Sequence, residues 1–316
     1  MSNKGKILAL AALAILLAAS FVFLDIGSNW EYVFPRRVKK ILAIVLTGGV
    51  IAISTIVFQT ITNNRILTPS IIGLDSLYML IQTFLVFLFG SMNLTVNNKN
   101  INFIISVGVM ILFAGFLYRL IFKKEGQNIY FLLLVGMIFG IFFESLSTFM
   151  QVLIDPNEFL VIQDRMFASF NQVNTDILFI AIILMLAAGV YFSRFIKYLD
   201  VLSLGKEQAI NLGVDYDCVV KRLLFVIAIF VSISTALVGP ITFLGLLVAN
   251  VAYQLFHTYQ HKYLIPGSVL ISIIALVGGQ LIVERVFTFS TSLSVIINFI
   301  GGVYFIYLLL KENKSW

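Results

Sequence analysis

The sequence predicts an all-α, polytopic membrane protein with about ten transmembrane helices. Of its 316 residues, 60% are hydrophobic and only 11% carry a charge, whereas soluble proteins carry about 25% charged residues. The mean hydropathy is +1.03, and charge-free stretches as long as a membrane span recur along the whole chain. So few charges cannot cover a water-exposed surface, which excludes a cytosolic enzyme, a disordered chain and a nucleic-acid-binding domain.

A membrane-spanning helix needs about 20 mostly apolar residues. Lys4 and Lys6 precede the first apolar stretch, which we interpret as a span rather than a cleaved secretion signal. The expected spans lie in the stretches 7–24, 41–64, 76–98, 100–118, 126–153, 177–193, 223–256, 263–283 and 286–310.

The stretch 223–256 is too long for one crossing, because its 34 residues would form a helix of about 51 Å. It contains Gly239-Pro240, and a proline cannot continue a helix without losing a backbone hydrogen bond. We therefore expect two spans here, the second short and covering about 242–256. This division brings the total to about ten.

An even number of spans places both termini on the same side of the membrane. With the termini inside, 14 of the 21 basic residues are also inside: Lys4, Lys6, Arg65, Arg119, Lys123, Lys124, Arg194, Lys197, Lys206, Lys221, Arg222, Lys262, Lys311 and Lys314. The other seven are outside: Arg36, Arg37, Lys39, Lys40, Lys99, Arg165 and Arg285. The excess of basic residues in cytoplasmic loops of membrane proteins predicts cytoplasmic termini.

The polar stretches 154–176 and 194–222 are too short for a separate core, so residues 1–316 are expected to form a single transmembrane domain. Within the second stretch we expect a short amphipathic cytoplasmic helix at about 203–213. Ser203 can cap its start and Gly213 can stop it. The helix either lies on the lipid surface or forms a docking surface for a cytoplasmic partner.

Catalytic and metal-binding patterns are not found in the sequence, so we expect neither an enzyme nor a cofactor. The single cysteine, Cys218, cannot form an internal disulfide. His257 and His261 have a helical i,i+4 spacing, but two ligands without a nearby carboxylate make a poor metal site. No phosphate-binding loop occurs, so nucleotide-driven work would need another subunit.

Glu144 is the only acidic residue well inside a predicted span. A carboxylate there either lines a path for a polar or cationic substrate or is a hydrogen-bonded structural group that faces another helix. An ion-coupled secondary transporter would need more intramembrane charge than this single residue. A membrane-embedded enzyme would need a cluster of catalytic polar residues inside the spans.

The cytoplasmic stretch resembles the coupling-helix pattern of FecCD-type permeases, the membrane subunits of ABC importers for iron-siderophores, haem and cobalamin. The residues that match this pattern in order and spacing are Leu202, Leu204, Gly205, Ala209, Leu212 and Gly213.

Four further stretches resemble family patterns in the same order. Pro35-Arg36 opens the second span, and the last span carries Gly301 and Phe305. The segment after the second span is similar in Gln59, Asn63, Asn64, Leu67, Pro69 and Gly73, and the Gly-Pro-Ile-x-Phe-x-Gly-Leu pattern is carried by Gly239, Pro240, Ile241, Phe243, Gly245 and Leu246.

The resemblance implies a type II ABC importer permease fold and no chemistry on the substrate. It implies a dimer of permeases, two cytoplasmic ATPase subunits and an extracellular substrate-binding protein. Departures from the family patterns, such as Val33 and Asn250, favour an iron-siderophore permease that pairs with a related second subunit, although an identical partner stays open. A cobalamin or haem permease of the same family is the alternative. The Lys-, Asn- and Ile-rich composition is typical of an AT-rich bacterium, and in a Gram-positive cell the binding protein would be a lipoprotein on the same plasma membrane.

Three groups of site residues follow from the resemblance and from charge. The expected ATPase-coupling residues are Ser203, Leu204, Gly205, Ala209, Leu212 and Gly213. The expected docking residues for the binding protein are Arg36, which matches the family arginine, Arg285, and, from charge alone, Arg37, Lys39 and Lys40. The candidates for the translocation path are Gln59, Asn63, Pro69, Gly239, Pro240, Phe243 and Glu144.

Overall fold

The computed structural model describes residues 2–24, 29–90, 98–121, 129–171, 173–289 and 291–312. These residues form 13 α-helices and one 3-10 helix, with no strand among them, which confirms the predicted all-α class. Three of the basic residues assigned to the inner side, Lys123, Lys124 and Lys314, lie outside the described residues.

The helices of the first half are α1 (Asn3–Phe23), α2 (Trp30–Thr62), the 3-10 helix η1 (Pro69–Ile72), α3 (Leu74–Phe89), α5 (Lys99–Ile121) and α6 (Ile129–Leu153). Those of the second half are α7 (Pro156–Met166), α8 (Thr175–Ser193), α9 (Ile196–Leu202), α10 (Lys206–Asn211), α11 (Tyr216–Val238), α12 (Leu244–Phe256), α13 (His261–Arg285) and α14 (Leu293–Glu312). Seven are long and apolar enough to cross a membrane, and α3, α12 and α14 are shorter apolar helices, which makes ten.

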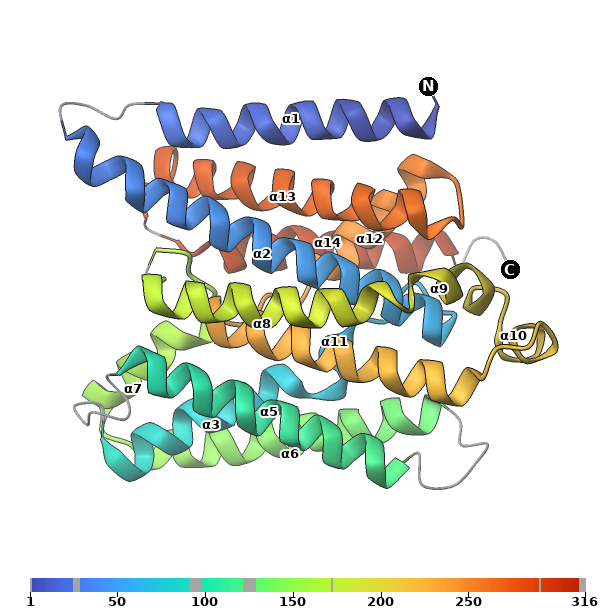
Figure 1. The fold of residues 1–316 in the computed structure, drawn as a ribbon. Coiled ribbons are helices and arrows are strands. Elements are labelled where there is room, and N and C mark those ends of the chain that lie inside the picture. The colour runs from blue at the N-terminus through green and yellow to red at the C-terminus, as the bar shows by residue number, and fades with distance from the viewer. Residues whose placement is uncertain are drawn as a thin grey trace.

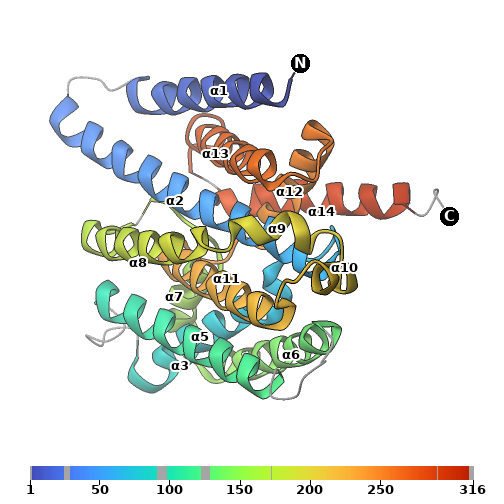
Figure 2. The same cartoon turned by 45° about the vertical axis from the view of Figure 1, so that its right-hand side comes forward.

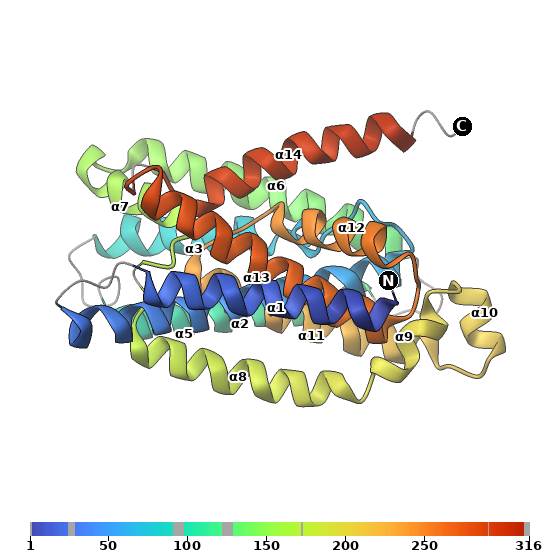
Figure 3. The ribbon, with the colours of Figure 1, turned by 90° about the horizontal axis from the view of Figure 1, so that it is seen from above.

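The long helices run side by side along one axis, so the bundle has two ends (Figure 1). The start of α1, the end of α14 and α10 lie at one end, called here the α10 end. The start of α2 and α7 lie at the other, called here the α7 end. Figure 2 turns the α10 end toward the viewer and shows α9 and α10 in front of the bundle. Figure 3 shows α10 beyond the ends of the long helices and α14 crossing the bundle at a tilt.

Two helices form the centre of the bundle. In the most apolar 18-residue segments of α2 and α11, 67% and 72% of the residues are buried, against 17% in α1 and 28% in α6. α2 contacts α11, α12 and α13, whereas α1 packs mainly on α13. The exposed apolar faces of α1 and α6 therefore require lipid or another protein chain around them.

The second half of the chain breaks where the Gly-Pro pair predicts. α11 ends at Val238 and α12 begins at Leu244. Gly239 has φ +98°, which a residue with a side chain adopts rarely, and a Cβ there would lie 3.0 Å from the Cα of Ala168. The turn therefore requires glycine at position 239 for two reasons, the positive φ angle and the close approach to Ala168.

A second break precedes α3 and was not predicted. Gly73 ends η1 with φ +84°, and a Cβ on it would lie 2.9 Å from the Cα of Gly140, halfway along α6. α3 therefore begins inside the bundle. The predicted span 76–98 is wrong in its bounds, because this helix ends at Phe89.

The start of the second span also differs from the prediction. Pro35 does not open the helix but lies inside α2, which begins at Trp30. Proline has no backbone N–H, so the carbonyl oxygen of Glu31, four residues earlier, loses its helical partner. This single lost hydrogen bond in the first turns does not end the helix. Arg36, Arg37, Lys39 and Lys40 are consequently helical.

Candidate functional site

The predicted coupling segment forms a short helix at the α10 end, but its bounds and its cap differ from the prediction. The helix covers Lys206–Asn211, with Gly205 at its start at φ +96°. Ser203 does not cap it, because its hydroxyl donates a 2.7 Å hydrogen bond to the carbonyl oxygen of Asp200 in α9. Gly213 follows the helix with φ +81°, as expected for a glycine stop.

Apolar side chains around α10 divide into a buried anchor and an exposed surface. Ala209 is fully buried, whereas Leu204 and Leu212 are 56% and 62% exposed. Ile210 is exposed as well. Exposed leucines on a segment that projects from the bundle form a surface suited to a protein partner.

Most of the predicted docking residues at the α7 end bind other parts of the same chain. Arg37 donates to the carbonyl oxygens of Phe21, Val22 and Leu24, the last at 2.5 Å, and Arg285 donates to that of Leu24 at 3.0 Å. The last carbonyls of a helix lack intrahelical partners. The two arginines therefore hold the end of α1 against α2 and α13.

The two lysines of the basic cluster are engaged in the same way. Lys40 forms a 2.8 Å ion pair with Glu284 of α13, and Lys39 donates to the Thr175 hydroxyl of α8 at 2.5 Å. Arg36 differs, because it is exposed and its guanidinium stacks over the exposed ring of Tyr32, 4.0 Å from the centroid. Of the five, Arg36 presents its charge most openly.

The candidate path residues lie at separate depths rather than in one site. Gln59 and Asn63 line a polar cavity of about 90 Å³ at the α10 end. Pro69 lines a smaller cavity inside the bundle, and Gly239 borders a larger one at the α7 end. Phe243, three residues after the half-buried Pro240, packs against Gly301 of α14, where an added Cβ would lie 2.5 Å from the Cβ of Phe243.

The cavity beside Pro69 holds a carboxylate that the sequence did not reveal. Asp75 lies in the first turn of α3, where it accepts a 3.0 Å hydrogen bond from the Thr235 hydroxyl of α11. The interrupted helices α3 and α12 both begin beside this cavity, and helix N-termini favour a carboxylate. Glu144 is thus not the only intramembrane acid. In the sequence Asp75 lies just before the predicted span 76–98. Hydropathy does not reveal that η1 places the start of α3 inside the bundle.

Glu144 is exposed on α6, on a face that it shares with large apolar side chains such as Ile141 and Phe142. None of the helices in the described part of the chain covers it. A carboxylate on an otherwise apolar helix face needs water or a polar partner.

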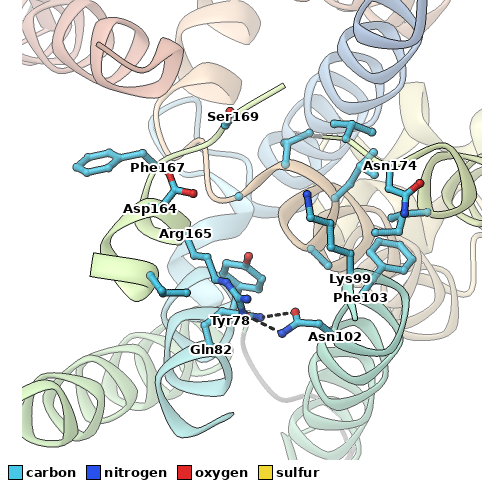
Figure 4. Close-up of a pocket in the computed structure, with 17 residues that line it drawn as sticks. Tyr78, Gln82, Lys99, Asn102, Phe103, Asp164, Arg165, Phe167, Ser169 and Asn174 are labelled. Atoms are coloured by element: carbon cyan, nitrogen blue, oxygen red, sulfur yellow. Dashed lines mark hydrogen bonds between the residues drawn. The ribbon is translucent and has the colours of Figure 1, made fainter. Parts of the chain in front are cut away.

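A larger cavity lies at the α7 end, between α3, α5, α7, α8 and the end of α11 (Figure 4). It has a volume of about 260 Å³ and is lined by Lys99, Asp164 and Arg165 among other residues. Gln82 and Asn102 exchange two side-chain hydrogen bonds of 3.1 Å, and Arg165 donates to the same Gln82 oxygen. Burial lowers the pKa of the Arg165 guanidinium below its ordinary value. The wall of the cavity therefore combines charged groups of both signs with apolar side chains such as Phe103.

Comparisons with known proteins agree with these features. The family model of the FecCD transport family matches residues 6–311. The chain is 68% identical over 316 residues, all of both chains, to the petrobactin import system permease protein YclO of Bacillus subtilis. It is 39% identical over 281 residues to the petrobactin import system permease protein FatC of Bacillus anthracis, covering 89% of this chain and 79% of that one.

A solved structure supports the fold independently. An inward-facing metal-chelate type ABC transporter superposes with a TM-score of 0.84, covering 98% of this chain and 100% of that one at 22% identity. The match confirms the predicted type II ABC importer permease fold, ten apolar helices included. By the extent of the family match and the identity to its relatives, the chain belongs to the FecCD transport family.

Proposed function

We propose that this chain is a permease subunit of an ATP-driven importer for a ferric siderophore, and that the siderophore is petrobactin. The observation that carries the proposal is the 68% identity, over the full length of both chains, to a petrobactin import permease. The 39% identity to a second petrobactin permease supports the same substrate. The subunit would move its cargo without covalent chemistry, and the iron belongs to the cargo.

The proposed orientation places the α10 end in the cytoplasm of a bacterial cell. Both ends of the described chain lie there together with α10 (Figure 1), as cytoplasmic termini require. The excess of basic residues in the predicted inner segments supports the same orientation. The α7 end, with Arg36, then faces the extracellular binding protein.

The coupling mechanism follows from this orientation. ATP binding would bring two ATPase subunits together. These subunits would contact the exposed leucines around α10, and their movement would be transmitted through α9 to the bundle. ATP binding can switch access only by favouring one arrangement of the helices over another. The candidate path residues lie at different depths, and this spread supports a path along the bundle rather than one binding site.

The second permease is proposed to be a related chain rather than an identical one. Bacillus subtilis has two petrobactin import permeases, YclO and YclN, to which this chain is 68% and 23% identical. Bacillus anthracis likewise has FatC and FatD, at 39% and 27% identity. The exposed face of α6, with Glu144, is the proposed contact with this partner or the shared path beside it.

Uptake measurements test the proposal. Cells that lack this gene should lose uptake of radioiron-labelled petrobactin and keep uptake of a ferric hydroxamate through its own permease. The purified permease pair, reconstituted with its ATPase and binding protein, should accumulate ferric petrobactin only with ATP. Transport by the permease in vesicles without an ATPase would contradict the importer class, and preserved petrobactin uptake in the deletion strain would contradict the substrate.

A further inference from the structure

A buried histidine at the α10 end connects three helices that lie far apart in the sequence. The ring of His261, the first residue of α13, is 2% exposed. Its Nδ1 lies 2.7 Å from the Asp200 carboxylate of α9, and its Nε2 lies 2.8 Å from the Thr60 hydroxyl of α2. One imidazole therefore spans the distance between α9 and α2.

Hydrogen-bond accounting fixes the direction of the bond to Asp200. The same carboxylate oxygen also accepts the backbone N–H of His261 at 2.8 Å. An ionised carboxylate only accepts hydrogen bonds, so Nδ1 must carry a proton. Burial alone would raise the pKa of Asp200, but the hydrogen bonds and charge of His261 lower it below its ordinary value. Asp200 is thus an anion that caps the N-terminus of α13.

Asp200 is rigidly connected to the coupling segment. Its carbonyl oxygen accepts the Ser203 hydroxyl, and the Gly205 amide donates to the carbonyl oxygen of Leu202 at 3.0 Å. Only residues 203–205 separate α9 from α10. A displacement of α10 must therefore move Asp200, and with it the imidazole.

Thr60 lies at the opposite side of the ring, in the last turns of α2. Its neighbour Gln59 donates a 2.6 Å hydrogen bond to the Arg65 carbonyl oxygen, and Asn250 of α12 donates to the same oxygen at 3.1 Å. His261 lines the same small cavity as Gln59 and Asn63. The imidazole thus joins the coupling segment to the part of α2 that carries two candidate path residues.

We propose that His261 is a positioning residue for transport: its imidazole, held between Asp200 and Thr60, transmits the movement of α10 to the end of α2. The inference rests on the proposed function, because it assumes that α10 receives the ATPase. It assigns no metal to the histidine, whose two ring nitrogens both have partners in the chain.

Two substitutions separate the two halves of the connection. In His261→Asn the amide nitrogen can replace Nδ1 and keep the bond to Asp200, whereas in His261→Gln it can replace Nε2 and keep the bond to Thr60. Thr60→Val keeps the side-chain shape and removes the hydroxyl, with its contact to the ring and its hydrogen bond to the Ile56 carbonyl oxygen within α2. The matched control is His257→Asn, because His257 is exposed and its φ of +47° suits asparagine.

The measurement is the amount of ferric siderophore imported per ATP hydrolysed by the reconstituted complex, together with basal ATP hydrolysis and thermal stability. We expect His261→Asn, His261→Gln and Thr60→Val to keep basal hydrolysis and to lower import per ATP about tenfold, the effect of losing one buried hydrogen bond to the ring. His257→Asn should behave as the unmodified protein.

Normal coupling in His261→Asn and Thr60→Val would overturn the inference, because the ring would then serve only the Asp200 cap. A loss of import and hydrolysis in equal proportion, with lower thermal stability, would also overturn it. Failure of the unmodified complex to import any ferric siderophore would instead refute the proposed function, so the two failures are distinguishable.

Discussion

The two ends of the bundle use their surface side chains in opposite ways. At the α7 end, Arg37, Lys40 and Arg285 bind carbonyl oxygens or a carboxylate of neighbouring helices. At the α10 end, Leu204 and Leu212 extend outward from a short helix whose Ala209 is buried. The first arrangement ties helices of one chain together, whereas the second leaves apolar surface for another chain.

This difference separates charges that are bound within the chain from apolar side chains that stay exposed. A basic residue near a helix end readily binds the carbonyls that the helix leaves unpaired. Arg37 and Arg285 do so at the end of α1, whereas the contact of Arg36 within the described residues is with the Tyr32 ring. An exposed leucine on a projecting segment gains nothing from its own chain, so it is available to a partner or to the lipid surface.

The largest effect is expected at the α10 end. Leu212→Glu should abolish import by preventing the ATPase from binding. An unpaired carboxylate in an apolar interface costs about 3 kcal/mol, which corresponds to about a hundredfold loss of affinity. Co-purification of the ATPase with the membrane subunits measures this loss. Leu160→Glu, at an equally exposed leucine of α7, is the matched control and should keep the ATPase bound. Retention of the ATPase by Leu212→Glu would contradict the coupling assignment.

A smaller effect is expected at the α7 end, where two adjacent arginines should behave differently. Arg36→Glu should weaken the binding protein about tenfold, and more at low salt, because a rim charge mainly orients encounter. Arg37→Gln should instead lower the thermal stability of the permease, because the end of α1 loses its hydrogen bonds. Binding-protein affinity at two salt concentrations and a thermal melt measure both variants. If Arg36→Glu and the unmodified protein bound the binding protein with equal affinity, the proposed docking role of the α7 end would be wrong.

The smallest effect is expected between the ends, at Glu144. Glu144→Gln removes the charge and keeps the shape. If the carboxylate lies beside a shared path, its loss should lower import about threefold, the scale of an exposed charge interaction. Basal ATP hydrolysis should not change. Import kinetics of the reconstituted complex measure the difference. Unchanged import would leave Glu144 as a packing residue against the partner permease.

The sequence was most informative about the number of helices and the coupling segment. Charge-free stretches gave the ten apolar helices, and Gly239-Pro240 located the division between α11 and α12. The stop at Gly213, together with the family resemblance at Gly205 and Ala209, located α10 to within a few residues. These features are local, because each depends on residues within one or two turns of each other.

Contacts between distant residues could not be read from the sequence. From the sequence Asp75 lies outside the predicted span, but in the structure α3 begins inside the bundle and Asp75 bonds to Thr235 of α11. Asp200 and His261 lie 61 residues apart, and Thr60 lies 201 residues from the same ring. No periodicity connects such positions, because the packing of α2, α9 and α13 brings them together.

Hydropathy and helix-breaking residues act along a single helix, so the sequence predicted a membrane protein with about ten apolar spans, and its resemblance to a family indicated a permease. Tertiary structure alone decided which basic residues remain open, where the intramembrane carboxylates lie, and that one imidazole connects the coupling segment to α2. The physical reason is that hydrogen bonds and ion pairs form between groups within about 3 Å, and only the packing of the whole bundle establishes that proximity.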